Sequence, residues 1–255
     1  MDAAGLPLRA FQAPKAGAAP EDCEDAYRFR VATPGPGQGR TPLALRVALA
    51  DGATACSGSR RWAELLVRAS LEAPGPFTRP AYFLPKLALL RRYWHQDAEA
   101  ALPAARPWWA DAALDQGAYA TLLRFQLRGN RWRAEALGDS CLLHLRAGAL
   151  LRSFPLETSE AFQAHPELIG SDPGLGQALR GRFRACSGRV HRGDLLLLAT
   201  DAVACWLLAT GEWASLLGRL EGDAPEAAFA AWVAEERGSR RLRNDDATLL
   251  VVTIP

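Results

Sequence analysis

Short apolar segments that alternate with polar residues and end at turn-forming residues constrain the fold of this chain most strongly. Alternation with a period of two over roughly five to eight residues is typical of strands with one buried face. Gly129-Asn130 and Ala147-Gly148 each separate two such segments, which predicts two β-hairpins. A Gly/Pro-rich loop, PGPGQGR, joins the first two strands. The predicted strands are 26–31, 43–50, 121–127, 131–137, 142–145, 149–154, 194–200 and 248–254.

Helical periodicity appears between these strands. Ser59 is placed to cap a helix whose apolar residues recur every three or four positions. Asp223 and Glu226 have the spacing of a capping box ahead of a second apolar face. Strands in hairpins, with helices grouped between them, favour an α+β sandwich over a parallel β-α-β sheet. Two further helices are expected on either side of Gly211, at 202–208 and 212–220.

The length of 255 residues is compatible with a single domain, residues 1–255, because mixed two-sheet folds often reach this size. The segment 73–116 is rich in proline and tryptophan, and we expect it to be a helical excursion from the core. Its tryptophans are expected to be packing anchors rather than a ligand cage. They are Trp94, Trp108 and Trp109.

The charge balance argues against a dedicated nucleic-acid binder. Thirty Lys and Arg residues against twenty-eight Asp and Glu residues leave a formal charge of +2, far from a strongly basic composition. The densest basic run, at 237–243, stands beside an acidic pair. We expect a solvated loop there rather than a docking patch for a phosphoprotein. No nucleic-acid partner is therefore expected.

Cysteine and histidine usage excludes several classes of protein. The five cysteines are widely scattered, without a C-x-x-C pair, which argues against a disulfide framework and a structural zinc site. The four histidines show no metal-ligand spacing such as H-E-x-x-H. The N-terminal residues do not read as a signal peptide, and no apolar run approaches ~20 residues. These features predict a cytoplasmic protein without a membrane partner.

Acidic residues stand at the ends of the predicted strands. Taken one at a time, each is an ordinary turn or capping residue. If the strands lie side by side, their acidic ends converge at one edge of a sheet, where clustered carboxylates repel one another unless a cation compensates. Oxygen ligands without His or Cys favour magnesium or manganese over zinc. The residues concerned are Glu24, Asp25, Asp51, Asp139, Asp201, Asp245 and Asp246.

Six motifs around these residues occur in the order found in a known family. They run from Glu24 to Val252, and together they resemble the metal-dependent, type-2C Ser/Thr protein phosphatases, in particular the bacterial members. The resemblance implies a four-layer αββα sandwich, with two central antiparallel sheets flanked by helices and the metals in a cleft at one end. The motifs are CEDAYRF, VALADGAT, GAYATLL, ALGDSCLLHLR, GDLLLLATDAV and NDDATLLVV.

Carried over position by position, the resemblance implies a ligand set for two manganese or magnesium ions. Asp51 would bridge the two ions. Glu24 and the carbonyl oxygen of Gly52 would complete one site, directly or through water. Asp201 and Asp245 would hold the other ion.

The resemblance also implies a mechanism and a substrate. Asp25 would orient metal-bound water, and Asp139 matches a position that helps some members bind a third, weaker ion. A hydroxide bridging the ions, with Asp25, Asp51 and Asp201 as the catalytic carboxylates, would attack phosphoserine or phosphothreonine without a phosphoenzyme. The expected partner is therefore a phosphorylated protein, the substrate of a Ser/Thr kinase.

The chain departs from the family pattern at positions that bear on catalysis. Pro20 stands where members usually place the arginine that clamps the phosphate, and proline cannot replace a bidentate guanidinium. Lys15 or Arg60 is a candidate to supply this charge from elsewhere. Ala202 replaces a usual Gly, and Asp246 a frequent Asn.

These departures leave an alternative function open. The chain could be a pseudophosphatase, a binding module that keeps the fold and recognises a phosphoprotein or partner without turnover. One more segment has two interpretations: residues 154–174 match in position the variable flap beside the active site of bacterial members, and they are equally compatible with an inert surface loop.

Overall fold

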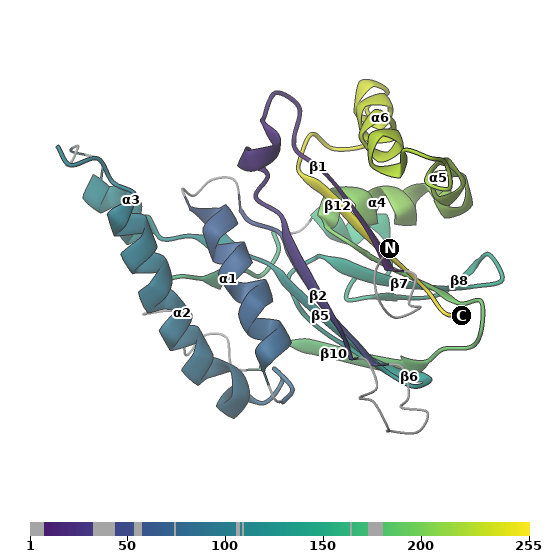
Figure 1. Ribbon diagram of the computed structural model, residues 1–255, viewed down its shortest axis with the longest axis horizontal. Coiled ribbons are helices and arrows are strands. Elements are labelled where there is room, and N and C mark those ends of the chain that lie inside the picture. The colour runs from purple at the N-terminus through teal and green to yellow at the C-terminus, as the bar shows by residue number, and fades with distance from the viewer. Residues whose placement is uncertain are drawn as a thin grey trace.

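The computed structural model describes residues 8–32, 44–53, 58–73, 75–105, 108, 110–163, 165–172 and 181–255. Within these ranges the chain forms two antiparallel five-stranded sheets, a short two-stranded sheet and helices on both outer faces (Figure 1). The Gly/Pro-rich loop expected after the first predicted strand lies outside the described residues.

The first sheet has the strand order β1-β12-β11-β7-β8, so that strands from both ends of the chain pair along one edge. β12 lies between β1 and β11, with Leu249 opposite both Phe11 and Ala199. The hairpin β7–β8 turns at Ala147 and Gly148, both with positive φ, as the Ala-Gly pair predicts. The bounds are β1 Leu8–Ala13, β7 Cys141–Arg146, β8 Ala149–Phe154, β11 Leu195–Ala199 and β12 Ala247–Thr253.

The second sheet has the order β10-β6-β5-β3-β2, with every neighbouring pair antiparallel. The hairpin β5–β6 turns at Gly129-Asn130, as predicted. A small third sheet pairs β4 (Tyr119–Ala120) with β9 (Ile169–Gly170). The other bounds are β2 Ala26–Ala32, β3 Ala44–Ala50, β5 Leu122–Arg128, β6 Arg131–Leu137 and β10 Arg184–Arg189.

An apolar core joins the inner faces of the two large sheets. Alternate residues of β3, including Leu45 and Val47, meet Leu250 and Val252 of β12 in this core. Because side chains alternate between the faces of a strand, the residues between them lie on the outer face. The period-two pattern of the sequence therefore sets which face of each strand packs against the other sheet.

Helices complete the outer layers. α1 (Ser59–Glu72) packs on the second sheet and α2 (Pro80–Ala100) packs against α1, while α4 (Asp201–Thr210), α5 (Trp213–Arg219) and α6 (Pro225–Gly238) cover the first sheet. Figure 1 shows the two helical groups on opposite sides of the paired sheets. The architecture is therefore the predicted α+β arrangement of four αββα layers.

Two predicted helix caps are wrong. Gly58, with a φ of 80°, is the N-cap of α1, and the Ser59 hydroxyl instead donates to the Ala53 carbonyl at 2.8 Å. α6 begins at Pro225 after Ala224, without a side-chain cap. Proline lacks the N–H that a cap would satisfy, so its position at the start of α6 removes part of the need for one. Gly211 does end α4, with a φ of 68°.

The segment 73–116 contains α2 and α3 (Ala110–Gln116). Trp94 is buried and its Nε1 donates to the Gly58 carbonyl at 3.1 Å, so it anchors α2 to the start of α1. Trp108 is 93% exposed, which contradicts its predicted packing role, and Trp109 lies outside the described residues. Among the helices in the described ranges, none is both long and apolar enough to cross a membrane.

Candidate functional site

Four aspartates predicted as site residues line one pocket of about 410 Å³ where strands of both large sheets end. Asp51 directly follows β3 and Asp139 lies between β6 and β7. Asp201 is the first residue of α4, shortly after β11, and Asp245 lies just before β12. The structure therefore brings together Asp51, Gly52, Asp139, Asp201 and Asp245, residues up to 194 positions apart in the chain.

Strand pairing explains this convergence. β11 and β12 are antiparallel, with Ala199 opposite Leu249, so the end of one strand adjoins the start of the other. In the second sheet, the Thr121 N–H donates to the Asp51 carbonyl at 2.8 Å, and the Asp51 N–H donates to the Thr121 hydroxyl at 3.1 Å. These bonds fix the backbone on which the Asp51 carboxylate stands.

Burial and repulsion between carboxylates disfavour the charged forms of Asp51, Asp139 and Asp201. Burial raises the pKa of Asp51 well above its ordinary value. Burial also raises the pKa of Asp201 to about 7, and repulsion from Asp139 and Asp245 adds to the shift. Four carboxylates repel the charge on Asp51, namely Asp25, Asp201, Asp245 and Asp139. The pocket therefore holds carboxylates that a cation or protons must compensate.

Asp25 is buried behind these carboxylates. Thr200 and Thr248 donate their hydroxyls to its Oδ2, at 2.9 and 2.7 Å. Its Oδ1 is buried without a hydrogen-bond partner among the described residues. Burial raises the pKa of Asp25 well above its usual range, although the two threonine hydroxyls oppose the shift, and repulsion from Asp246 and Asp201 adds to it. An orphaned carboxylate oxygen calls for a proton, a water or a cation.

Glu24 and Gly52 lie against each other at the edge of this site. A Cβ atom on Gly52 would stand 2.8 Å from the Glu24 carbonyl oxygen, so only glycine permits this approach. The Glu24 carboxylate forms an ion pair with Lys15 at 3.1 Å. Asp246 accepts the N–H groups of Lys15 and Glu24, at 2.8 and 2.6 Å, and so ties this segment to β12.

The donor set fits hard divalent cations, because it consists of carboxylate and carbonyl oxygens. Within the described residues, no three Asp, Glu, His or Cys side chains are already placed so that they could hold an ion. Two of the carboxylates are turned instead to cationic side chains: Glu24 to Lys15 and Asp201 to Arg243. The residues and their burial fit a metal centre whose side chains would rearrange when cations bind.

Arg243 is a site residue that the sequence did not single out. It lines the pocket, its guanidinium lies 3.5 Å from the Asp201 carboxylate, and it donates to the Phe162 carbonyl at 3.1 Å. The prediction of a solvated loop holds for the exposed Arg240 and Arg241 but not for the whole of 237–243. Arg237 lies in the last turn of α6, where it donates to the carbonyls of Pro14 and Asp245. In the sequence, the only sign that this basic run lies near the site is the acidic pair Asp245-Asp246 that follows it.

Neither Pro20 nor Arg60 provides a phosphate clamp at this pocket, and Ala202 fits its position without strain. Pro20 begins an exposed 3₁₀ turn, η1 (Pro20–Asp22). Arg60 is exposed and pairs with Glu64 at 3.3 Å, so it does not supply the missing clamp at this pocket. Ala202 is buried in the first turn of α4 in helical conformation, which alanine adopts without strain.

Part of segment 154–174 forms one wall of the pocket. Phe162, in the 3₁₀ turn η2 (Ser159–Gln163), lines it together with His165, Pro166 and Leu168. β9 follows, and its Ile169 carbonyl accepts the indole N–H of the buried Trp62 at 2.6 Å. The segment is thus anchored to α1 on one side and borders the acidic residues on the other.

Comparisons with known proteins agree with this architecture. No family model matches the chain, and neither does any curated protein. The crystal structure of a bacterial serine phosphatase superposes with a TM-score of 0.63 at 13% sequence identity, covering 98% of each chain. The serine/threonine phosphatase Stp1 from Staphylococcus aureus gives 0.63 at 13%, covering 98% of this chain and 95% of its own.

A third solved structure is the catalytic domain of the serine/threonine protein phosphatase PstP in complex with two manganese ions. It gives a TM-score of 0.55 at 19% identity and covers 98% of this chain and 99% of its own. At such identities a structural likeness establishes the architecture, here over almost the whole described chain. The chain therefore has the fold of these phosphatases, as the order of its sequence motifs implies.

Proposed function

We propose that this chain is a metal-dependent protein phosphatase that hydrolyses phosphoserine and phosphothreonine. The observation that carries the proposal is the convergence of Asp51, Asp139, Asp201 and Asp245 in one pocket, on the fold of solved phosphatases. The manganese ions in the PstP structure support a two-metal site of the same kind here. The whole chain, residues 1–255, acts as one catalytic domain in this proposal.

The proposed ligands are those that the family resemblance implies, and all of them except Glu24 line the pocket. Asp51, Glu24 and the Gly52 carbonyl would hold one cation, and Asp201 and Asp245 the other. Asp139 would contribute to a third, weaker site. When bound, manganese or magnesium would supply Lewis acidity that makes a water nucleophilic at neutral pH and polarises a phosphoryl oxygen.

The remaining residues orient the reactants. Asp25, whose Oδ2 accepts the hydroxyls of Thr200 and Thr248, would hold the attacking water through its otherwise unpartnered Oδ1, by accepting a hydrogen bond from it. Arg243 would bind the phosphoryl oxygens, because it is the guanidinium that lines the pocket. A guanidinium can bind phosphate with two parallel hydrogen bonds, the task that Pro20 cannot perform.

The alternative function, a pseudophosphatase that binds without turnover, has one specific observation in its favour. Lys15 and Arg243 already pair with two proposed ligands, Glu24 and Asp201, at 3.1 and 3.5 Å. Cationic side chains can compensate carboxylates as metal ions do. Against this interpretation stands the complete set of aspartates that converge on the pocket and repel one another, because a chain without metals would gain stability by losing one of them.

Hydrolysis of p-nitrophenyl phosphate separates the two functions. We expect turnover that requires added manganese or magnesium and disappears in excess EDTA, because oxygen ligands alone would activate the water only through a cation. Full activity in excess chelator would contradict the metal mechanism. No turnover with either metal, combined with a metal-induced rise in melting temperature, would establish the binding module instead.

A further inference from the structure

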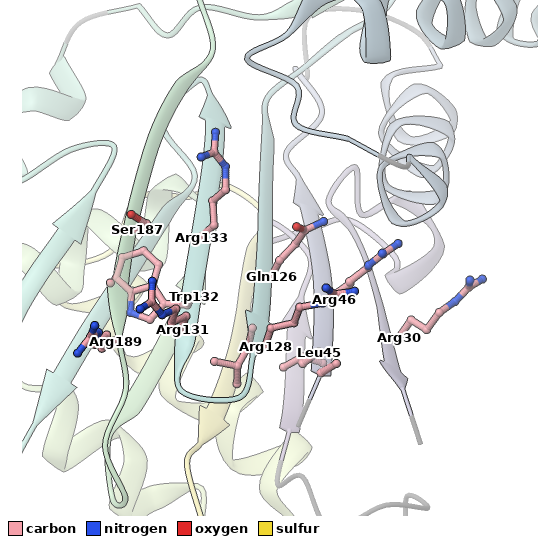
Figure 2. A pocket seen from close by; sticks show the side chains of 13 residues that line it. Arg30, Leu45, Arg46, Gln126, Arg128, Arg131, Trp132, Arg133, Ser187 and Arg189 are labelled. Atoms are coloured by element: carbon pink, nitrogen blue, oxygen red, sulfur yellow. The ribbon is translucent and has the colours of Figure 1, made fainter. Parts of the chain in front are cut away.

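A large hollow on the described surface lies apart from the aspartates and is lined by arginines. It is a groove of about 830 Å³ on the outer face of the second sheet. Figure 2 shows these side chains standing on neighbouring strands of that sheet. We call this hollow the arginine groove. The arginines that line it are Arg30, Arg46, Arg128, Arg131, Arg133 and Arg189.

Strand register places the arginines in two rows that cross the sheet. In one row Arg30 lies opposite Arg46, and the row continues through Gln126 to Arg133. In the other row Arg131 of β6 lies opposite both Arg128 of β5 and Arg189 of β10. The first row ends at Ser187 of β10, opposite Arg133. Its four strand spacings of about 4.8 Å span ~19 Å, of which the distance from Arg30 to Arg133 takes three, or ~14 Å.

The groove occupies the part of this face that α1 leaves open. Arg46 donates to the carbonyl of Leu71, in the last turn of α1, so the groove begins where the helix ends. Under the helical layer the same face carries Arg124, which is buried and paired with Glu135 at 3.2 Å. The buried arginine is thus compensated within the chain.

The exposed arginines of the groove are compensated far less. Arg133 reaches Glu135 at 3.1 Å, but no acidic residue lines the groove in the part of the chain that the structure describes. Like charges directly opposite on paired strands destabilise a sheet, and here Arg131 faces two arginines. Nearly all basic residues of this chain are arginines, so finding arginine rather than lysine in the groove is not informative. The informative feature is that six of them lie together.

We propose that the arginine groove binds an acidic, extended segment of a partner polypeptide. Carboxylates pair with guanidinium groups through two parallel hydrogen bonds, and an extended chain of about six residues spans the ~19 Å row. Such a segment supplies the negative charge that the described residues lining the groove do not provide. Binding would therefore relieve the repulsion between the opposed arginines.

The lining of the groove favours a polypeptide over nucleic acid. Proteins that bind single strands offer exposed aromatic rings on which bases stack. The only aromatic residue that lines this groove within the described residues is Trp132, which is 3% exposed and packs in the core between the sheets. The chain's net charge of +2 is also low for a nucleic-acid binder.

A link to the aspartate pocket follows from the strands that the two sites share. β3 carries Arg46 and is followed by Asp51, five residues further, so the sites lie roughly 17 Å apart along this strand. If the proposed phosphatase function holds, one substrate could place its phosphorylated residue in the pocket and an acidic tract in the groove. This extension rests on the proposed function, whereas binding to the groove does not.

The direct test uses a fluorescein-labelled peptide of about ten glutamates, which contains no phosphoester. Its affinity for the full-length protein is measured by fluorescence anisotropy at low and physiological salt. The test variant is Arg128→Gln/Arg131→Gln/Arg189→Gln. The control, Arg68→Gln/Arg92→Gln/Arg192→Gln, removes the same charge from exposed arginines outside the groove.

We expect the groove variant to raise Kd at least ~tenfold and the control less than ~twofold, where tenfold corresponds to about 1.4 kcal/mol. The melting temperature of the groove variant should hold or rise, because opposed like charges are removed. No binding by the wild-type protein, or equal weakening in both variants, would overturn the proposal. Tighter binding of a single-stranded oligothymidylate through the same three arginines would assign the groove to nucleic acid and also overturn it.

A separate measurement tests whether a substrate of the proposed phosphatase docks its acidic tract in the groove. A phosphoserine peptide with a run of glutamates about six residues away is compared with p-nitrophenyl phosphate. The groove variant should show a higher KM for the peptide, unchanged kcat, and unchanged turnover of the aryl phosphate. Equal KM values for wild type and variant would contradict substrate docking, while a protein with no turnover that still binds the glutamate peptide would contradict only the phosphatase function.

Discussion

Asp201 illustrates how one residue can serve the backbone and the site at once. It begins α4 immediately after Thr200, and 14% of its side chain is exposed, in the pocket. Burial raises its pKa to about 7 and makes its charge costly in the absence of a compensating cation. Asparagine has the same shape as aspartate but no charge. Replacing Asp201 by asparagine therefore separates its role in the backbone of α4 from its role in the pocket.

We expect Asp201→Asn to lose at least ~100-fold in metal-dependent turnover, because an amide gives a divalent ion no negative charge. The melting temperature without metal should hold or rise, since a repelling carboxylate has been neutralised. Turnover of p-nitrophenyl phosphate with manganese, and melting curves with and without manganese, test both parts. Near-wild-type turnover in a folded variant would make Asp201 a turn residue.

Arg243 gives a second prediction at this scale. Arg243→Gln should weaken inhibition by inorganic phosphate about tenfold, because the pocket loses the guanidinium that would bind the anion. Arg243→Lys should recover part of the affinity through its charge alone. Arg240→Gln, a change in the same exposed loop, is the matched control. An unchanged inhibition constant in Arg243→Gln would assign Arg243 only to its pairing with Asp201.

At the scale of elements, Asp194 joins two strands of the first sheet. It is buried just before β11 and accepts hydrogen bonds from His144 and Arg146 of β7, each at 2.8 Å, and from the His191 N–H at 2.8 Å. Although burial opposes the charge, these donors lower the pKa of Asp194 below its usual value. The charged carboxylate therefore stabilises the folded chain.

We expect Asp194→Asn to lower the free energy of unfolding by about 3 kcal/mol, because Arg146 and His144 would lose a buried partner. A lowered folded pKa means that this stabilisation is present above the unfolded value of ~3.9 and disappears as the pH falls toward the folded pKa. Urea titrations between pH 3 and pH 7 should therefore show a flatter acid dependence in the variant. Asp223→Asn, in an exposed loop, is the control, and equal slopes in the two variants would contradict this role.

The elements that sequence reasoning predicted share a physical cause. Strands such as β3 and β12 have an apolar face in the core between the sheets, so alternation and flanking turns reveal them. β10 was not predicted, because this edge strand is mostly exposed and carries few apolar residues. The capping residues of α1 and α6 were misassigned because Gly58 and Pro225 begin these helices by backbone conformation rather than by side-chain hydrogen bonds.

The sequence predicted those site residues that directly follow an apolar strand. It did not predict the residues that only tertiary packing brings to the pocket. Asp51 and Asp201 follow apolar strands, which is a local signal. Arg243 enters the pocket through its loop and its bond to Phe162, which no local pattern encodes. The arginine groove is the extreme case: its residues are scattered singly or in pairs from Arg30 to Arg189, and only the sheet register gathers them.

For the whole molecule, the buried carboxylates predict how stability without metal depends on pH. A folded pKa of about 7 for Asp201, above the unfolded ~3.9, means that the folded state holds more protons between these values. Stability is then greatest near the lower pH and is lost as the pH rises to about 7. In EDTA, we expect a higher melting temperature at pH 5.5 than at pH 7.5.

Saturating manganese should reverse much of this loss at pH 7.5, because cations favour the charged carboxylates and bind only the folded site. Asp201→Asn should show a smaller difference between the two pH values. Differential scanning fluorimetry in EDTA and in manganese measures all four conditions. A metal-free protein that melts higher at pH 7.5 would show that the carboxylates are not repelling one another.

The second sheet also separates charge along its strands. Its aspartates lie where β3 and β6 end, and its arginines gather where β3 and β6 begin. In the metal-free molecule these two groups of charges contribute an electric dipole moment roughly parallel to the strands. An approaching acidic chain would experience a torque that presents the arginine end first, at distances up to the Debye length of about 8 Å at physiological salt. Loading the aspartates with cations would shrink that moment and leave both ends attractive to anions.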